Sequence, residues 1–179
     1  MNKKETAFIG LGSNLGDARC HVEEAFDEIA QIEDTELIAR SSLYHTVPYG
    51  VTRRQPPYIN AVAQVTTTLS AEKLFAAMKN IERKHHRARP YRFAPRSLDL
   101  DLLLYGQHIS HSRYLTLPHP RLHERAFALT PLLEIAPKAY IPGRGMALAA
   151  LHALMFKYQW SGIRDQKNVV LRTQNHRVD

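Results

Sequence analysis

The order of strand-like and helix-like segments is the feature that most constrains how this chain can fold. Short apolar or alternating segments predict strands at Ala7–Leu11, Leu37–Thr46, Tyr58–Leu69 and Leu98–Tyr105. Between the first and second strands, and between the third and fourth, apolar residues recur with the three-four spacing of a helix with one buried face. The resulting order is strand, helix, strand, strand, helix, strand. It is typical of ferredoxin-like α+β domains (βαββαβ), in which an antiparallel sheet carries helices on one face.

Residues suited to helix capping precede both predicted helices. Asp17 precedes the first helix and Ser70 precedes the second, and the side chains of both residue types can accept a hydrogen bond from a free backbone N–H group. The apolar positions of the first helix are Ala18, Val22, Ala25, Phe26, Ile29 and Ala30. Those of the second are Leu74, Phe75, Met78 and Ile81.

The chain of 179 residues has the length of one compact domain, and it shows neither an internal repeat nor a linker. We therefore expect a single domain over residues 1–179. Further helices are predicted around Glu124–Leu129 and Ala147–Phe156. The basic tail, residues 157–179, has five bases and two acids and no clear period, so it is either an added edge strand at Val169–Leu171 or partly disordered.

The sequence offers no sign of a membrane or secreted protein. No apolar run approaches the roughly 18–20 residues needed to span a bilayer, and the polar segment Met1–Glu5 does not resemble a signal peptide. The single cysteine, Cys20, cannot form a disulfide within the chain. We expect a cytoplasmic monomer that does not bind membranes.

Positive charge is concentrated in one segment. The formal net charge is +7, and residues 79–96 contain seven lysines and arginines against one acid, Glu82. A basic surface attracts polyanions, which include both nucleic acids and nucleotide phosphates.

Two aspartates lie directly after this basic segment. Because side chains alternate along a strand, Leu98, Leu100 and Leu102 point to one face and Asp99 and Asp101 to the other. Two neighbouring carboxylates repel each other unless a cation binds between them, and Mg²⁺ prefers such oxygen ligands. The alternative is an acidic pair that faces solvent on an edge strand.

The arginines next to the aspartates favour a nucleotide site. Arg87, Arg89, Arg92 and Arg96 lead directly into the strand of Asp99. Guanidinium groups bind phosphate oxygens well, and phosphoryl transfer depends on positioning and charge stabilisation. A surface that only binds nucleic acid gives no reason for the paired aspartates, so we expect no nucleic-acid partner.

Other motifs are less specific. Gly12–Gly16 lacks a Walker lysine, and we interpret it as a tight turn between strand and helix. The ten histidines show no zinc-binding spacing, so transition-metal chemistry is not expected. His119, between two prolines, could donate to a phosphate or serve only the structure of a turn.

Five motifs together resemble the 6-hydroxymethyl-7,8-dihydropterin pyrophosphokinase family. The most specific is Arg92-Phe-Ala-Pro-Arg-Ser-Leu-Asp-Leu-Asp-Leu-Leu103. The others are Ile9–Gly16, Ser41–Thr46, Tyr58–Ala61 and Pro118–Phe127, and all five occur in the family's order within about residues 7–137.

The resemblance implies a ferredoxin-like fold and the transfer of pyrophosphate from ATP to a pterin, with AMP as the second product. Asp99 and Asp101 would hold two Mg²⁺ ions, and Arg87 and Arg96 would act on the phosphates with Arg92 as a helper. The ATP-binding residues would include Glu82, Thr116, His119 and Arg125. Those around the pterin would be Thr46, Tyr58, Asn60 and Phe127.

The sequence departs from the family's pattern at three loop positions. Val47 replaces a common proline, His86 a frequent glycine, and Phe93 a tryptophan found in several members. None of the three is a predicted metal ligand or phosphate-binding arginine. Two alternatives to the enzyme stay open: a basic ferredoxin-like module that binds RNA, and a catalytically silent relative that keeps the site.

Overall fold

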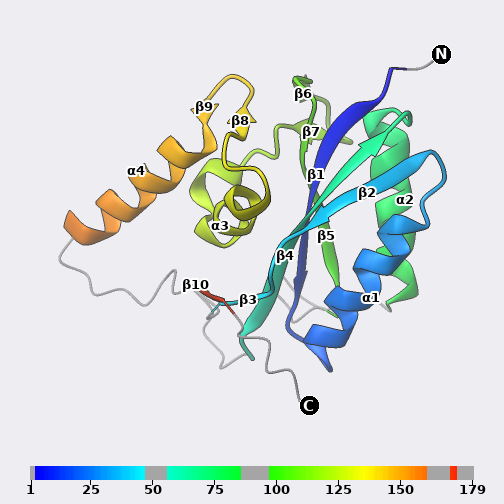
Figure 1. The fold of residues 1–179 in the computed structure, drawn as a ribbon, viewed down its shortest axis with the longest axis horizontal. Helices are drawn as coiled ribbons and strands as arrows, with labels where there is room; N and C mark the ends of the chain where they lie inside the picture. Colours follow the sequence, from blue (N-terminus) through cyan, green and yellow to red (C-terminus); the bar gives the residue numbers. More distant parts are fainter. Residues whose placement is uncertain (1–2, 47–55, 86–96, 161–169, 173–179) are drawn as a thin grey trace.

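The computed structural model describes residues 3–46, 56–85, 97–160 and 170–172 of the chain. Their largest element is a six-stranded sheet with the order β10-β3-β4-β1-β5, in which β2 also pairs with β4 (Figure 1). Every pairing in this sheet is antiparallel. Its strands are β1 (Glu5–Ser13), β2 (Thr35–Arg40), β3 (Tyr44–Thr46), β4 (Tyr58–Thr67), β5 (Asp99–Tyr105) and β10 (Val170–Arg172).

Two helices cover one face of the sheet, as predicted. They are α1 (Ala18–Ala30) and α2 (Ala71–Lys84), and both lie on the same side of the sheet in Figure 1. Asp17 Oδ1 accepts a hydrogen bond from Cys20 N at 3.0 Å, and Ser70 Oγ accepts one from Lys73 N at 3.3 Å, so both predicted caps are confirmed. The buried core on this face joins the alternate apolar residues of the strands to those of the two helices: Ala7, Ile9, Leu11, Leu100 and Leu102 with Val22, Phe26, Ile29, Leu74, Met78 and Ile81.

The opposite face of the sheet is covered by one of the later helices, whose place the order of elements did not predict. Helix α3 (Ala126–Ile135) lies on the opposite side of the sheet, and α4 (Ala147–Trp160) lies beyond α3 (Figure 1). A second core forms there, in which Val62 and Leu103 pack with Leu129 and Leu132. The register between β1 and β5 shifts between Phe8 and Ile9, which leaves Leu103 as an extra residue. This bulge ends the alternation of β5 and provides the apolar surface that α3 covers.

The predicted strand Leu37–Thr46 is divided into β2 and β3. Between them, Ser41 N donates to the carbonyl of Val62, and Ser41 Oγ accepts from Val62 N at 2.8 Å. This contact replaces regular strand pairing, so that β2 and β3 pair with different parts of β4.

The elements outside the main sheet and its helices are short. Two small hairpins form, β6 (Ser110–His111) with β7 (Thr116–Leu117), and β8 (Tyr140–Ile141) with β9 (Gly145–Met146). A 3₁₀ turn, Leu122–Glu124, precedes α3. Strand β10 pairs with β3 at the edge of the sheet, one residue later than the edge strand predicted at Val169–Leu171. Residues 161–169 and 173–179 of the tail lie outside the described residues. In the part of the chain that is described, no helix has the length and apolar character required to cross a bilayer.

Candidate active site

Strand register brings the two aspartates onto the same sheet face as a buried asparagine. Asp99 pairs with Gly12 of β1, and Gly12 pairs on its other side with Asn60 of β4. Asp101 pairs in the same way with Gly10. Directly paired residues point to the same side of a sheet. Both carboxylates therefore share the face of Asn60, which is also the face that α3 covers further along the strands.

Gly12 makes room for the Asn60 side chain. A Cβ atom at position 12 would lie 3.2 Å from Asn60 Oδ1, closer than ordinary van der Waals contact. The Gly12–Gly16 segment is a turn only at its end, where Gly16 has a φ of +64°, because β1 continues through Ser13. Our interpretation of the whole segment as a turn thus missed a site residue. A glycine within a strand, which often marks close approach of another group, was the available signal.

The predicted pterin residues on β3 and β4 are neighbours. Asn60 Nδ2 donates to Thr46 Oγ1 at 2.7 Å, and both side chains are buried. Thr46 pairs in register with Tyr58, which is half-buried. Thr46 thus orients the Asn60 amide, and Tyr58 adds an aromatic side chain on the same face.

His119 and Arg125 approach Asp101 from outside the sheet. Arg125 donates from a terminal guanidinium nitrogen to Asp101 Oδ2 at 3.0 Å, and His119 Nε2 lies 3.7 Å from the same oxygen. The backbone N–H of His119 donates to the Leu103 carbonyl, which fixes this histidine beside β5. Arg125 also lies over the ring of Phe127, with its central carbon 5.6 Å from the ring centroid.

Both nitrogens of the His119 ring have neighbours. Its Nδ1 accepts from the backbone N–H of Arg121 at 3.2 Å, and its Nε2 lies 3.7 Å from Asp101 Oδ2 and 3.4 Å from a terminal guanidinium nitrogen of Arg125. The shorter Arg121 bond places the proton of the neutral ring on Nε2, and the Arg125 contact is then a close approach of two donors. Burial lowers the pKa of His119, and the nearby Arg125 charge acts in the same direction, whereas Asp101 opposes it. His119 can therefore serve as a neutral hydrogen-bond donor.

Glu82 lies beneath β5. Its Oε1 accepts from Leu100 N at 2.7 Å and from Lys79 Nζ at 2.9 Å, and the residue is 1% exposed. Burial raises the pKa of this carboxyl, against the lowering effects of the Leu100 N–H and of Lys79. Glu82 thus holds the backbone between the two aspartates, and its partner Lys79 was not expected from the sequence.

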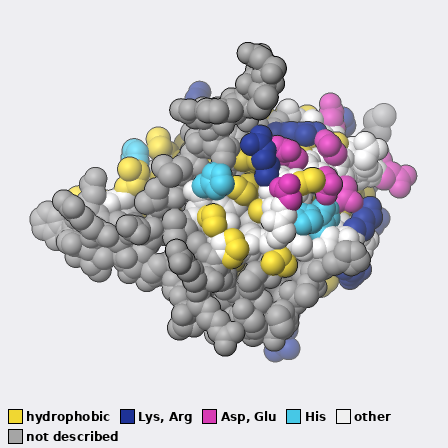
Figure 2. Space-filling view, turned by 90° about the horizontal axis from the view of Figure 1, so that it is seen from below, with side chains coloured by type: hydrophobic (Ala, Val, Ile, Leu, Met, Phe, Trp, Pro, Cys, Tyr) yellow, Lys and Arg dark blue, Asp and Glu magenta, His cyan; other side chains and the backbone are white. Residues whose placement is uncertain are grey.

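One side of the molecule carries a mixed polar area. Figure 2 shows the molecule from the lower side of Figure 1, where histidine, acidic and basic side chains gather in one area bordered by grey atoms. Thr116, the remaining predicted ATP residue that is described, lies in β7. Its hydroxyl donates to the Ser112 carbonyl at 3.2 Å.

Comparison with known proteins shows where this combination of residues occurs. Residues 8–137 match the family described as 7,8-dihydro-6-hydroxymethylpterin-pyrophosphokinase (HPPK). The chain belongs to the HPPK family. The match includes every predicted site residue and coincides closely with the span of the five motifs.

Similar proteins occur in bacteria. A 2-amino-4-hydroxy-6-hydroxymethyldihydropteridine pyrophosphokinase of Haemophilus influenzae is 42% identical over 137 residues, which cover 76% of this chain and 85% of the relative. One of the same name from Pseudomonas aeruginosa is 37% identical over 138 residues, or 77% of this chain and 85% of the relative.

Solved HPPK-containing structures have the same fold. A Plasmodium falciparum HPPK-DHPS chain with SDX-DHP superposes with a TM-score of 0.74 at 14% identity, and the match covers 96% of this chain. An HPPK-DHPS chain in complex with substrates gives 0.71 at 12% identity over 95% of this chain. This chain spans about half of each, 48% and 47% respectively. The predicted ferredoxin-like α+β class is confirmed.

Part of the predicted HPPK site lies outside the described residues. This applies to Arg87, Arg92 and Arg96, and to two of the departures from the family's pattern, His86 and Phe93. Val47, the third departure, lies outside them as well. The described site therefore consists of the aspartate strand, the Asn60–Thr46 pair, the Glu82–Lys79 pair and the His119–Arg125–Phe127 group.

Proposed function

We propose that this chain transfers pyrophosphate from ATP to 6-hydroxymethyl-7,8-dihydropterin in folate biosynthesis. The names of its relatives support the reaction. The structural observation that carries the proposal is the row Asp99–Gly12–Asn60, which crosses three strands on one sheet face. It sets an acidic pair suited to a cation-bound triphosphate beside an amide suited to the edge of a heterocycle.

The reaction is a displacement at the β-phosphorus of ATP. The hydroxymethyl oxygen of the pterin forms a bond to the β-phosphorus and loses its proton. The bond from the β-phosphorus to the oxygen that bridges it to the α-phosphorus breaks, and AMP leaves with that oxygen. The products are AMP and the pterin pyrophosphate. The protein must hold the two reactants in line and offset the negative charge of the phosphates.

Asp99 and Asp101 fit magnesium. Both are half-buried carboxylates on one rigid strand and one face, and Mg²⁺ is commonly bound through one or two carboxylates together with substrate phosphates and water. We propose that the pair holds two Mg²⁺ ions. When bound, such ions neutralise phosphate charge and stabilise both the entering and the leaving oxygen.

Arg125 and His119 contribute from the other side of Asp101. The Arg125 guanidinium is bonded to Asp101 and is half-buried, so it can exchange this carboxylate for a phosphate oxygen with a small movement. His119 is positioned to donate its Nε2 proton to the nucleotide while its Nδ1 stays bound to the backbone. In this proposal Arg87 and Arg96 add charge on the phosphates, with Arg92 as a helper, and Thr116 borders the nucleotide. Glu82 supports the nucleotide site from beneath β5 through its bond to Leu100 N.

The pterin would bind next to Asn60. A flat heterocycle needs aromatic surfaces and a few donors and acceptors at its edge. Asn60 offers an amide that Thr46 orients, and Tyr58 and Phe127 offer rings. The hydroxymethyl group would then point along the row toward Asp99.

Isosteric substitutions test the proposal. We expect Asp99→Asn and Asp101→Asn each to reduce AMP formation from ATP and the pterin by more than ~100-fold, since even the loss of a bond supporting a metal ligand costs about 10–100-fold. Asp27→Asn is the matched control, because Asp27 forms a surface ion pair with Arg40. AMP and pterin pyrophosphate are measured by chromatography, and circular dichroism verifies the fold. Wild-type turnover in the folded Asp101→Asn variant would refute the role of the acidic pair.

A further inference from the structure

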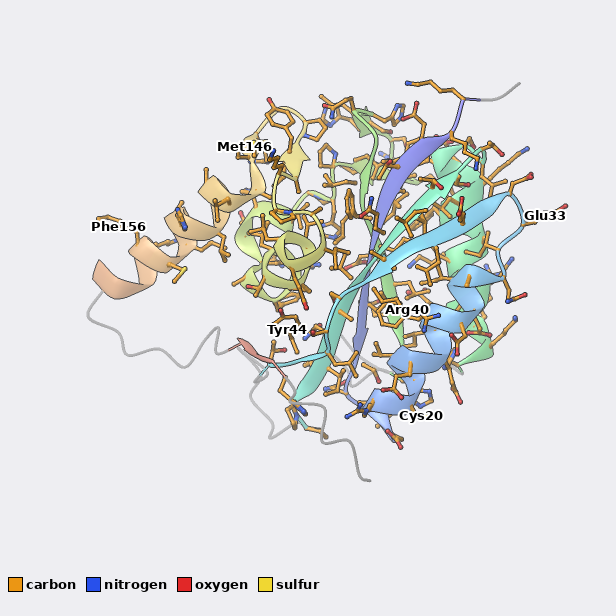
Figure 3. The ribbon with its side chains drawn as sticks, viewed as in Figure 1. Cys20, Glu33, Arg40, Tyr44, Met146 and Phe156 are labelled. Atoms are coloured by element: carbon orange, nitrogen blue, oxygen red, sulfur yellow. The ribbon has the colours of Figure 1, made fainter. Side chains whose placement is uncertain are left out.

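Three potential metal ligands meet where the start of α1 approaches the end of α2. They are His21 and Glu24 of α1 and His85, the C-cap residue directly after α2, and one ligand atom from each lies within 4.8 Å of the others. Figure 3 labels Cys20, which marks this end of α1. None of the three residues belongs to the proposed active site.

The His85 ring is oriented for metal binding by Glu28. His85 Nε2 lies 2.8 Å from Glu28 Oε2. An ionised carboxylate can only accept, so Nε2 carries the proton of the neutral ring, and the lone pair of Nδ1 points toward His21. Lys84 Nζ, 3.3 Å from the other Glu28 oxygen, helps to fix this carboxylate. A carboxylate bound to the far nitrogen is the usual support of a metal-binding histidine.

The distance between the two histidines fits a shared ion. His21 Nδ1 and His85 Nδ1 lie 3.0 Å apart, with the rings nearly perpendicular at 74°. Two tetrahedral ligands at the usual zinc–nitrogen distance of about 2.0–2.1 Å are about 3.3–3.4 Å apart. The two Nδ1 atoms therefore need to move apart by only a few tenths of an ångström to bind one ion. Without an ion, His21 Nδ1 donates to His85 Nδ1. Metal binding replaces this proton, and the neutral His21 ring then carries its proton on Nε2, which lies near Gly16.

Glu24 supplies a negatively charged third ligand. It lies three residues after His21, on the same side of α1, and is exposed. Its Oε1 accepts from the Cys20 thiol at 3.3 Å. The carboxylate oxygen is the ligand atom that lies within 4.8 Å of the two histidine nitrogens.

We propose that His21, Glu24 and His85 bind a divalent transition-metal ion of the Zn²⁺ class. Two imidazoles and one carboxylate form a known zinc ligand set, with a fourth position for water. Imidazole does not favour Mg²⁺, so this site is chemically distinct from the aspartate pair. The sequence did not suggest it, because the ligands come from two helices that are far apart in the chain.

The ion would join the two helices on this face of the sheet. The carbonyl of His85 accepts a hydrogen bond from Ser97 Oγ, two residues before Asp99. A metal bound at His85 would therefore stabilise the end of α2 and the segment that enters β5. Binding to the folded state alone raises the unfolding temperature in proportion to the logarithm of metal concentration.

Zinc titration of the full chain tests the proposal. Calorimetry with ZnCl₂ at neutral pH in excess Mg²⁺, without ATP or pterin, should show one site that His21→Ala and Glu24→Gln each weaken at least ~10-fold. Glu28→Gln, which removes only the support of His85, should weaken it by about 10–100-fold. The matched control is the double variant His108→Ala/His111→Ala, which removes two exposed histidines elsewhere and should bind as wild type does.

A second measurement identifies the ligands. Bound Co²⁺ should give the visible absorption of a four-coordinate site, lost in the His21→Ala variant. His21 and Glu24 are surface positions of α1, so these variants test the site even if His85→Ala fails to fold. Zinc binding by the His21→Ala and Glu24→Gln variants with wild-type affinity, or its loss in the control, would overturn the proposal. Neither result depends on whether the chain transfers pyrophosphate.

Discussion

The buried pair of Glu82 and Lys79 makes a quantitative prediction about stability. The Glu82 side chain is 2% exposed and that of Lys79 is 24% exposed, and their charged atoms lie 2.9 Å apart. Lys79 Nζ also donates to the Leu100 carbonyl at 2.9 Å. Lys79→Met keeps most of the aliphatic stem but leaves the carboxylate buried without its cation. The loss of unfolding free energy therefore comes from the buried carboxylate of Glu82.

The expected loss can be worked from these contacts. Removal of one partner from a fully buried ion pair costs about 3–5 kcal/mol. Here Lys79 is partly exposed, and Glu82 keeps the Leu100 N–H, so we expect about 2–3 kcal/mol for Lys79→Met. With an m-value of about 2 kcal/mol/M, the urea midpoint should fall by about 1–1.5 M. Unfolding is followed by far-ultraviolet circular dichroism at neutral pH.

The loss should depend on pH with a defined sign. Burial raises the pKa of Glu82 above its ordinary value. The stability associated with its protonated form is fully present below the ordinary pKa and is lost as pH rises through the raised folded-state pKa. Lys79 lowers this pKa, so its removal raises the pKa further. The difference in stability between wild type and Lys79→Met should thus be largest at neutral pH and shrink as the solution is acidified toward the ordinary glutamate range.

A second substitution separates the charge from packing. Glu82→Gln keeps an oxygen for the Leu100 N–H and leaves a lysine that can reach water, so alone it should cost about 1 kcal/mol or less. Added to Lys79→Met, it should restore part of the lost stability, because no buried charge is left unpaired. The reasoning from the buried charge is wrong if the stability losses of the two single variants add up in the double variant. It is also wrong if Lys79→Met loses the same stability at pH 4 as at pH 7.

Three further predictions concern single residues. Gly12→Ala places a methyl group against Asn60 Oδ1, so the KM for the pterin should rise about tenfold, equivalent to 1.4 kcal/mol, with little change in the KM for ATP; an unchanged pterin KM would exclude this role. Glu134 accepts from Ser42 N, Ser42 Oγ and Tyr44 Oη; Glu134→Ala should cost about 1–2 kcal/mol of unfolding free energy, and Tyr44→Phe less, since it removes one bond of the three. For Arg87→Ala we expect the single-turnover rate to fall by about 10²–10³-fold with ATP affinity nearly unchanged, and a defect in binding alone would contradict its role in chemistry.

Features set by local sequence could be predicted. Helices α1 and α2 begin where expected because their capping side chains, Asp17 and Ser70, act within three residues. Asp99 and Asp101 lie on one face because alternation holds over that part of β5. The short range of these interactions is the reason that sequence patterns suffice for them.

Features that depend on contacts between distant parts of the chain could not be predicted from the sequence. Alternation alone does not indicate that β5 bulges at Leu103, which depends on pairing with β1 and provides the surface for α3. The contact of Arg125 with Asp101 spans 24 residues and depends on where α3 packs. For Glu82, the family resemblance implied a place along the nucleotide, but not that Leu100 N and Lys79 bind its carboxylate from below.

The face that carries the candidate site is divided along its strands into an apolar and a polar part. On β4, Val62 lies under α3, and two residues earlier on the same face comes Asn60. On β5, Leu103 packs against α3, and Asp101 and Asp99 precede it. The change from apolar to polar residues is offset by one pair between the two strands, because Val62 and Asp101 both pair with Gly10. On β5 it occurs where Arg125 contacts Asp101, just before α3 begins.

This division predicts how variants on the face should behave. Side chains under α3 exclude water and contribute mainly to the unfolding free energy. Those beyond it hold the polar groups proposed to bind ligands and contribute mainly to turnover. Val62→Ala should therefore lower the unfolding temperature with near-normal turnover, whereas Asp99→Asn should lower turnover with a smaller change in the unfolding temperature, since it keeps the shape of the side chain. Both variants are measured in the same assays. If each lowered stability and turnover in equal proportion, the division of the face into two parts would be wrong.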